Sequence, residues 1–529
     1  MFRQFFVTIL FISCLQLTQA QCNVVEENKV QCNGSMHNFH IVVHRENQDL
    51  RSIALSEISF KNVHKNYFQE IPQIRTVDIV QNTIETIESH IFTTIKNLTK
   101  LNISKNTITS LPEHFEGLEH LRIFIFQQNI ILSNPENVRK LLLNFVRNSK
   151  NVEYLHLTDN NIVNLNWIEE LPNLFGLEVM GNNIKVIPND LYLHLPQLKY
   201  MNFKFNNMSE IGDKTFNGFF ELADVRLSHN NIQYISDSSF VDLNKLIALN
   251  LQNNSISVLE GKIFKGLNSM RILDVNENRL EEVPDNVFQY VPFLIHLNLK
   301  DNIISKVGKS AFRGLSLLNL LDIGNNYIEN VCGDMFRDLS GLTKLLLRRN
   351  DIQTLSTNTF VKMPNLKILD LAYNQIKNIQ NEAFNDFINL DELDLSHNQI
   401  EFWNPKAFKN VYKIVKINLK ENRIKIIQSQ AFYNLNVIYI DFKNNLINRI
   451  DPDGFRGLHS LEYLGLSGNE VENLQRETFN GLSKLRCVDF AHNKVQKINA
   501  SEYLPTVQNI FTRDVTTEKK KFIQDVTVE

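Results

Sequence analysis

The chain has 529 residues, and its 55 Lys and Arg side chains nearly balance its 58 Asp and Glu side chains, leaving a formal net charge of −3. This balance gives no basic field of the kind that holds nucleic acid, and it gives no acidic tail. A length of 529 residues exceeds what one hydrophobic core normally supports, yet no composition shift marks a second domain. We therefore expect a repetitive architecture in which each segment contacts only its neighbours.

Residues 1–20 are predicted to be a secretory signal peptide. Arg3 provides the positive start, residues 5–17 form an apolar stretch, and small residues up to Ala20 provide a cleavage site. The mature chain would begin at Gln21 and be secreted. No later stretch approaches about 20 apolar residues, so we expect no membrane span. The polar C-terminal end gives no lipid-anchor signal.

Residues 21–49 are predicted to form an N-terminal cap with one disulfide. Cys22 and Cys32 lie just before the first repeat, where an exposed apolar edge needs covering, and an oxidising compartment would let them pair. The same segment holds three histidines that could in principle bind zinc, but no fourth ligand follows at a familiar spacing. They are His37, His40 and His44. We expect no metal and no cofactor.

An asparagine recurs through residues 50–499, mostly every 24 residues. The 18 positions are Asn82, Asn106, Asn129, Asn160, Asn182, Asn206, Asn230, Asn254, Asn278, Asn302, Asn326, Asn350, Asn374, Asn398, Asn422, Asn445, Asn469 and Asn493. A sustained period of this length predicts a solenoid, which usually presents a long surface to a partner.

One repeat shows why the period matters physically. Leu369 and Leu371 alternate with polar residues, as in a short strand with one buried face. The amide of Asn374 can then pair with backbone groups of its own turn and the next. Ten residues after most of these asparagines comes a phenylalanine, and the row should stack as an inner spine. It comprises Phe216, Phe240, Phe264, Phe288, Phe312, Phe336, Phe360, Phe384, Phe408, Phe432, Phe455 and Phe479.

This pattern, L-x-x-L-x-L-x-x-N followed by L-x-x-L and a Phe, resembles the extracellular 24-residue type of leucine-rich repeat. The resemblance extends to Toll-type receptor ectodomains, chaoptin-like adhesion proteins and secreted insect immune proteins. It implies an α/β-type solenoid of about 18–19 repeats, shaped as a horseshoe with a concave parallel β-sheet and a mostly irregular convex side. The chain departs from many relatives because residues 500–529, predicted as a cap segment and polar tail, contain no cysteine. It also lacks the coiled coil of the complex-forming insect proteins.

The interval from Asn129 to Asn160 is 31 residues, and the excess predicts a helix. Asn134 would cap it and Pro135 suits its first turn. Its apolar face would pack on the convex side. That face comprises Val138, Leu141, Leu142, Phe145 and Val146.

Six sequons agree with secretion: Asn33, Asn97, Asn102, Asn207, Asn253 and Asn499. Asn102 lies between Leu101 and Ile103, so its side chain should stand on the concave face. A glycan there would obstruct the first part of the horseshoe.

Positions −6, −4, −2 and −1, counted back from each asparagine, should project from the concave sheet. Two clusters of candidate ligand-binding residues occupy them. The first has apolar and aromatic side chains, with Gly176 and Gly181 leaving room beside them: Tyr154, Met180, Tyr200 and Phe205. The second could meet an acidic or sulfated ligand, and Arg349 should reach Tyr373 for a cation–π contact. It comprises Lys344, Arg348, Arg349 and Tyr373.

The two remaining cysteines cannot pair, because Cys332 and Cys487 lie seven coils apart, roughly 33 Å at ~4.8 Å per strand. Cys487, at position −6, is either an intermolecular link in a homo- or hetero-dimer or a free, shielded thiol. Histidines and aspartates also form columns, but repeats separate them. We therefore predict no catalytic site and no enzyme.

The sequence thus predicts a secreted recognition or scaffold protein. Its concave face would bind a protein or a glycan, in innate immunity or adhesion. An alternative hypothesis is a non-catalytic subunit that stabilises a secreted enzyme or complex.

Overall fold

The chain forms two compact units, each a parallel-strand solenoid, with about 18 turns in total. Unit 1 comprises Met1–Ser255 and Ile263–Met270, and unit 2 comprises Ile256–Lys262 and Arg271–Glu529. The computed structural model describes residues 21–26, 29–35, 51–59, 61–69, 71–108, 115–129, 135–360, 362–384, 387, 390–408, 411, 413–433, 435–495, 497–498, 507–511 and 516–517. The predicted signal peptide and most of the predicted tail lie outside these ranges.

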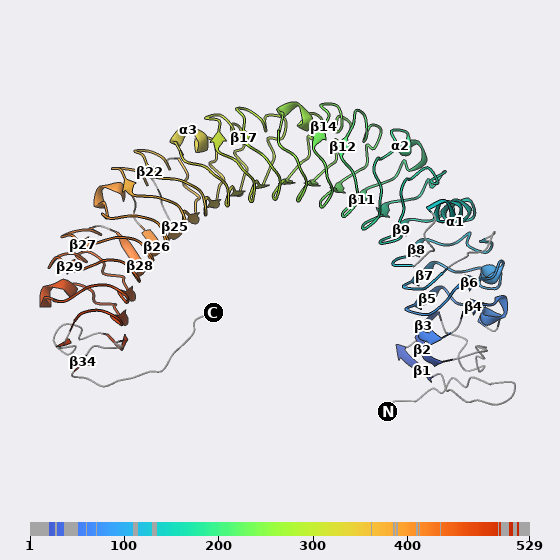
Figure 1. The fold of residues 1–529 in the computed structure, drawn as a ribbon, viewed down its shortest axis with the longest axis horizontal. Coiled ribbons are helices and arrows are strands. Elements are labelled where there is room, and N and C mark those ends of the chain that lie inside the picture. The colour runs from blue at the N-terminus through green and yellow to red at the C-terminus, as the bar shows by residue number, and fades with distance from the viewer. Residues whose placement is uncertain are drawn as a thin grey trace. The chain divides into compact units, whose positions relative to one another are not determined.

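Unit 1 begins with an antiparallel hairpin, and every later strand of its main sheet pairs in parallel with the one before (Figure 1). These strands are β1 (Gln21–Glu26), β2 (Lys29–Ser35), β3 (Ser52–Ser59), β5 (Thr76–Val80), β7 (Lys100–Ser104), β8 (Ile123–Ile125), β9 (Tyr154–His156), β10 (Gly176–Glu178), β11 (Tyr200–Asn202), β13 (Asp224–Arg226) and β15 (Ala248–Asn250). The hairpin register sets Cys22 opposite Cys32. Opposed residues in an antiparallel pair have Cα atoms about 4.5–5.5 Å apart, a spacing that a disulfide can span. The disulfide itself stays a prediction.

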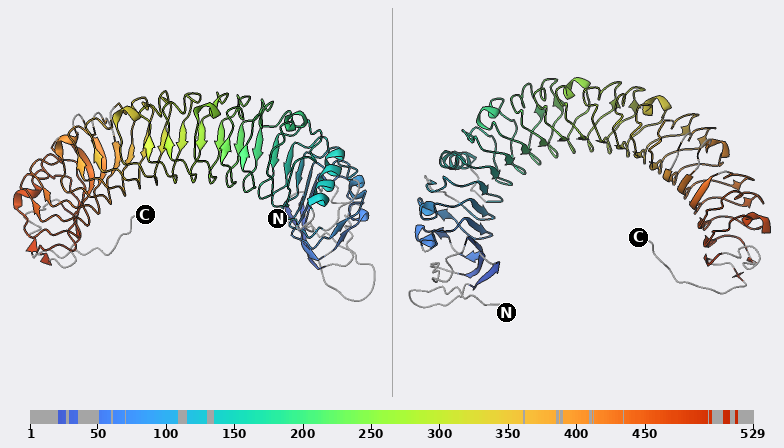
Figure 2. Two further views of the ribbon diagram at one scale, coloured as in Figure 1. Left: turned by 45° about the horizontal axis from the view of Figure 1, so that its top comes forward. Right: turned by 180° about the vertical axis from the view of Figure 1, so that it is seen from behind.

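Unit 2 repeats the same parallel pairing, strand after strand. Its strands are β16 (Ile272–Asp274), β18 (His296–Asn298), β20 (Leu320–Asp322), β21 (Lys344–Leu346), β23 (Ile368–Asp370), β25 (Leu390–Asp394), β26 (Lys413–Asn418), β28 (Asn436–Asp441), β30 (Tyr463–Gly465), β31 (Cys487–Asp489) and β33 (Asn509–Phe511). Within each unit these strands lie side by side as a row of short arrows (Figure 2). We call the outward side of this row the sheet face.

Shorter elements fill the rest of each coil, and the mostly irregular character expected from the sequence is confirmed. Two-residue parallel strands pair between alternate coils: β4 (Asn62–Val63), β6 (Thr86–Ile87), β12 (Glu210–Ile211), β14 (Tyr234–Ile235), β17 (Glu282–Val283), β19 (Lys306–Val307), β22 (Thr354–Leu355), β24 (Asn378–Ile379), β27 (Ile426–Ile427), β29 (Arg449–Ile450), β32 (Lys497–Ile498) and β34 (Thr516–Thr517). Single helical turns are η2 (Lys65–Phe68), η3 (Ile91–Thr94), α2 (Leu191–His194), η4 (Gly261–Phe264), α3 (Gly333–Phe336), η5 (Pro405–Phe408) and η6 (Arg476–Phe479). No helix among the residues described is long and apolar enough to cross a membrane.

The predicted helix is confirmed as α1 (Pro135–Asn148), which lies on the side of unit 1 away from the strands (Figure 1). All five residues of its predicted apolar face are buried. Phe145 stacks on Phe124 with ring centroids 3.9 Å apart and meets Phe115 edge-on. The predicted cap, Asn134, lies outside the described residues.

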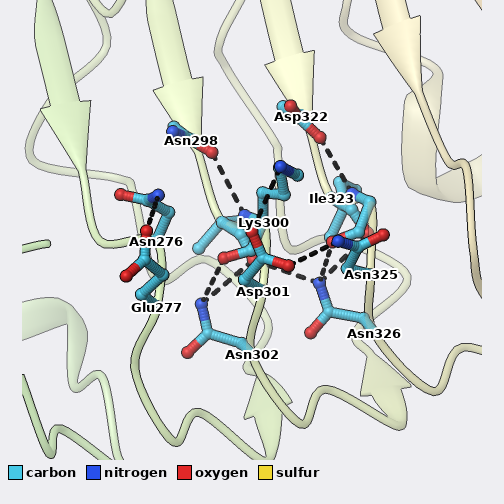
Figure 3. Close-up of polar contacts among 12 residues, drawn as sticks. Asn276, Glu277, Asn298, Lys300, Asp301, Asn302, Asp322, Ile323, Asn325 and Asn326 are labelled. Carbon is cyan, nitrogen blue, oxygen red and sulfur yellow. Dashed lines mark hydrogen bonds and ion pairs between the residues drawn. The ribbon is translucent and has the colours of Figure 1, made fainter. Parts of the chain in front are cut away.

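The asparagine ladder is built as the period predicts. Asn326 donates from Nδ2 to the carbonyls of Leu299 and Ile323, both at 3.1 Å, and its Oδ1 accepts the N–H of Ile304 at 3.0 Å (Figure 3). Asn302 makes the same pair of donations one coil earlier. Each side chain therefore joins its own turn to the turns on both sides.

The predicted phenylalanine spine is confirmed within each unit. In unit 2 consecutive rings stack at centroid distances of 6.1, 6.4, 6.0 and 5.9 Å from Phe288 to Phe384. Trp403 then inserts between Phe408 and Phe432, with centroids 5.1 and 5.2 Å away. These rings are buried, so core packing explains the phenylalanine content.

Every residue that directly precedes a ladder asparagine has a positive φ. These residues are Gln81, Lys105, Gln128, Asp159, Gly181, Phe205, His229, Asn253, Glu277, Asp301, Asn325, Arg349, Tyr373, His397, Glu421, Asn444, Gly468 and His492. Left-handed backbone at a non-glycine residue is uncommon and costs roughly 1 kcal/mol or more. The ladder hydrogen bonds hold this conformation, and it turns each −1 side chain outward at the edge of the sheet face.

Candidate functional site

The sheet face of unit 1 brings two of the predicted tyrosines together across a glycine. Tyr154, Gly176 and Tyr200 occupy the same register position in adjacent strands. A Cβ on Gly176 would lie 2.8 Å from Cδ1 of Tyr154 and 3.7 Å from Cδ1 of Tyr200. Glycine is therefore what allows both rings to lean over β10. Tyr154 remains 42% exposed.

A polar row flanks these tyrosines at position −4. Glu178 accepts hydrogen bonds from the Tyr200 hydroxyl at 2.5 Å and from Nδ2 of Asn202 at 2.6 Å. Burial, followed by this hydrogen bond, raises the pKa of Tyr200, so its hydroxyl stays protonated and donates. Arg226 lies over the Tyr200 ring at 5.0 Å and pairs with Asp224 at 2.9 Å. The face of Tyr200 is therefore fixed.

Two further aromatic rings stand at the edge of this surface. Phe205 is 52% exposed at position −1, and His229 of the next coil stacks on it with centroids 4.2 Å apart and planes 10° apart. Met180 is half-buried at position −2. On the opposite side of Glu178, burial lowers the pKa of His156. This imidazole is therefore neutral near pH 7.

We call the five residues Tyr154, Tyr200, Phe205, His229 and Arg226 the aromatic surface of unit 1. Sequence reasoning found three of them. It missed the other two, although His229 follows Phe205 by 24 residues and the period alone would have paired them.

In unit 2 the structure brings three of the four predicted residues together. The guanidinium of Arg348 lies 4.6 Å from the ring centroid of Tyr373, and that of Arg349 lies 5.3 Å from it. The ring of His397 stacks against Tyr373 with a centroid distance of 4.0 Å. Lys344 is exposed at position −6 and belongs to a separate row. Again, 24-residue spacing from Tyr373 would have identified His397.

A second aromatic cluster in unit 2 surrounds Cys487 and was not foreseen. Tyr439 stacks on Tyr463 at 4.3 Å, and Tyr463 neighbours Cys487 in register. Burial, and then the charge of Asp489, raises the pKa of the Cys487 thiol to about 11. The reactive thiolate is therefore scarce at neutral pH. Cys487 is half-buried and unbonded to another cysteine, as is Cys332, and the intermolecular link stays a prediction.

Three of the six sequon asparagines are exposed: Asn97, Asn207 and Asn253. Asn102 is half-buried on the sheet face, where its Oδ1 accepts the hydroxyl of Ser104 at 2.5 Å. The side chains of Asn33 and Asn499 lie outside the described part. Glycosylation stays a prediction at all six.

Within the described ranges, no group of three or more His, Cys, Asp or Glu side chains is arranged to hold a metal ion. The three N-terminal histidines His37, His40 and His44 lie outside those ranges.

Comparison with known proteins agrees with the geometry. A leucine rich repeat profile matches residues 72–131, 220–280, 268–328, 317–376, 364–424 and 412–471, more than half of the chain. The chain belongs to the leucine-rich-repeat family. No curated protein sequence matches it significantly.

Solved leucine-rich-repeat structures share the fold. A leucine-rich-repeat protein of Leptospira interrogans is 21% identical, with a TM-score of 0.55, covering 86% of this chain and 99% of that chain. A chain of the Toll–Spatzle complex of Drosophila is 15% identical, with a TM-score of 0.59, covering 89% and 76%. Its glycosylated form is 14% identical, with a TM-score of 0.55, covering 93% and 89%. At these identities the likeness is one of fold.

Proposed function

We propose that this leucine-rich-repeat protein is a secreted recognition protein that binds a protein or glycan partner through its sheet face. The observation that carries the proposal is the aromatic surface of unit 1. Leucine-rich repeats bury their leucines, and a sheet face that carries exposed aromatic rings gives up solvation for no gain in folding. Aromatic and arginine side chains are the residues that most often dominate binding energy at interfaces.

The local geometry supports a prepared surface. Gly176 makes room for two tyrosines, and Glu178 holds the Tyr200 hydroxyl and the Asn202 amide in place. Side chains fixed before binding lose less conformational entropy when a partner docks. A partner would therefore meet rigid rings at Tyr154 and Phe205.

A role in innate immunity or adhesion is part of the proposal. The Toll–Spatzle structure is described as a hub in Drosophila development and innate immunity, and its fold is shared. Secretion rests on the predicted signal peptide and the six sequons.

The test starts with expression of the full-length chain in a secreting host. We expect recovery from the medium with an N-terminus at Gln21. The secreted protein then serves as bait for extracellular material of its source, in parallel with a glycan array. Tyr154→Ala and Phe205→Ala should each abolish retention of the partner.

Tyr234→Ala is the matched control, because Tyr234 is 59% exposed in the same unit but lies on β14, away from the sheet face. Retention that survives both sheet-face substitutions, or that Tyr234→Ala abolishes equally, would overturn the assignment of this surface. A chain retained inside the cell would overturn secretion.

A further inference from the structure

One coil of unit 2 departs from its neighbours at position −4. In eight other coils an Asp or Asn at −4 accepts the backbone N–H of the −2 residue, at 2.8–3.2 Å, as Figure 3 shows for Asn298 with Lys300. The eight acceptors are Asp274, Asn298, Asp322, Asp370, Asp394, Asn418, Asp441 and Asp489. This hydrogen bond satisfies a backbone donor that would otherwise face outward from the sheet face.

The coil that ends at Asn350 has Leu346 at position −4 instead. The backbone N–H of Arg348 consequently donates to no acceptor among the residues that the structure describes. Gly465 omits the acceptor in a later coil, but Ser467 and Gly468 follow there, where this coil has two arginines. Only here in unit 2 does an unused N–H lie beside two cations.

Both arginine side chains are exposed and lack a carboxylate partner within the described part of the chain. Their guanidinium groups converge on the ring of Tyr373, which His397 backs from the other side. Gly324 and Ala372 occupy position −2 on either side of Arg348, so no large side chain covers it.

The acidic groups nearby are already engaged. Asp322 and Asp370 flank Leu346 in register, are about two-thirds buried, and accept the backbone N–H groups of Gly324 and Ala372 at 2.9 Å. Asp301 pairs with Lys300 at 3.2 Å. Arg348 and Arg349 thus keep their hydrogen-bond donors for an external group.

The floor beside the arginines is aliphatic. Leu320 and Ile368 flank Lys344 at position −6, and Leu346 lies next to it at −4; all three aliphatic side chains are half-buried. A sugar ring would need polar partners for its hydroxyls on such a floor. An aliphatic side chain needs none. The combination of a greasy floor and unpaired cations favours a protein segment over a polysaccharide.

We propose that this surface binds an acidic, partly aliphatic segment of a protein partner. An oxyanion of that segment would accept hydrogen bonds from the Arg348 and Arg349 guanidiniums and from the Arg348 backbone N–H. An adjoining aliphatic side chain would cover Leu346 and its neighbours. The inference rests on the proposed function only in using the sheet face as the binding face.

The test uses the full secreted chain and a fluorescent peptide of alternating glutamate and leucine, followed by anisotropy at low and physiological ionic strength. The glutamine–leucine analogue and a heparin-derived oligosaccharide are the comparison probes. We expect the acidic peptide to bind. Arg348→Ala combined with Arg349→Ala should weaken it at least about tenfold, because charge-assisted hydrogen bonds are lost.

Two variants separate this site from general electrostatics. Lys377→Ala combined with Arg423→Ala removes the same charge from exposed positions beyond the ladder asparagines and should leave affinity within about twofold. Leu346→Asn keeps the charge, supplies the acceptor that other coils have, and makes the floor polar. It should fold normally and also bind about tenfold more weakly.

Undiminished binding by Leu346→Asn would refute the role of the N–H and the floor. Equal losses in both double variants would reduce the effect to net charge. Tight binding of the oligosaccharide without the peptide would overturn the choice of a protein partner. None of these results alters retention through Tyr154 and Phe205, so failure here is distinguishable from failure of the proposed function.

Discussion

Replacing Asn326 with alanine should test the ladder at a single position. The carboxamide has two N–H hydrogens, and they serve the carbonyls of Leu299 and Ile323. Its oxygen is the one acceptor for the N–H of Ile304 among the described residues. Alanine removes all three hydrogen bonds from a site where Asn326 is only 5% exposed.

The three losses differ in cost. Each carbonyl keeps a second donor, since Leu299 also accepts from Asn302 at 3.1 Å and Ile323 from Asn350 at 3.0 Å. Losing one of two donors costs about 0.5–1.5 kcal/mol at each carbonyl, whereas a buried N–H left without any partner costs about 1–3 kcal/mol. The sum is about 2–6 kcal/mol, and the largest single part belongs to Ile304.

Amide hydrogen exchange measures this directly, because a solenoid opens locally and a single global unfolding free energy is poorly defined for it. We expect the opening free energy at the Ile304 amide to fall by about 2–6 kcal/mol in Asn326→Ala. Asn330→Ala is the control, since Asn330 is exposed in the same coil. Unchanged protection at Ile304, or an equal fall in the control, would refute the ladder as the source of stability.

Three further predictions concern the sheet face. Phe205→Gly should change the thermal unfolding free energy by less than about 1 kcal/mol, because glycine relieves the positive φ while the stack on His229 is lost; a loss above about 2 kcal/mol contradicts this. Alkylation of Cys487 should be slow at pH 7 and rise with a midpoint near pH 11, and Asp489→Asn should lower that midpoint. Because the folded pKa is raised from 9.0, the thiol's stabilising contribution is present below pH 9.0 and lost as pH rises through about 11; a midpoint near 9 refutes the shift. Gly176→Ala should displace the Tyr154 ring and destabilise unit 1 by about 1–3 kcal/mol, seen as altered tyrosine fluorescence and a lower melting temperature, whereas Gly314→Ala lacks any such clash.

The ladder and the spine were predictable because their physics repeats. An amide such as Asn326 satisfies the same three backbone groups in coil after coil, so the sequence must supply it at a fixed interval. The helix α1 was predictable for a related reason, since its extra residues interrupt the period and carry their own apolar face. Trp403 was not, because it replaces no member of the phenylalanine row but enters between two of them.

The candidate surfaces were only partly predictable, and the reason lies in how contacts cross the coils. Phe205 and Tyr373 stand out as exposed aromatic residues, but their stacking partners His229 and His397 were interpreted as a separate histidine column. The unused N–H of Arg348 was also missed. Its signal was present in the sequence, because Leu346 occupies a position where most coils of unit 2 have Asp or Asn.

The positive φ at position −1 explains why surface chemistry varies so freely on a regular frame. A left-handed residue normally favours glycine, yet glycine occupies this position in only two coils, at Gly181 and Gly468. The hydrogen bonds of the adjoining asparagine impose the conformation, so the −1 side chain need not favour it. Arginine, tyrosine, phenylalanine and histidine can therefore stand there at a modest and similar cost. The period dictates the fold, and binding specificity is left to side chains that the fold does not constrain.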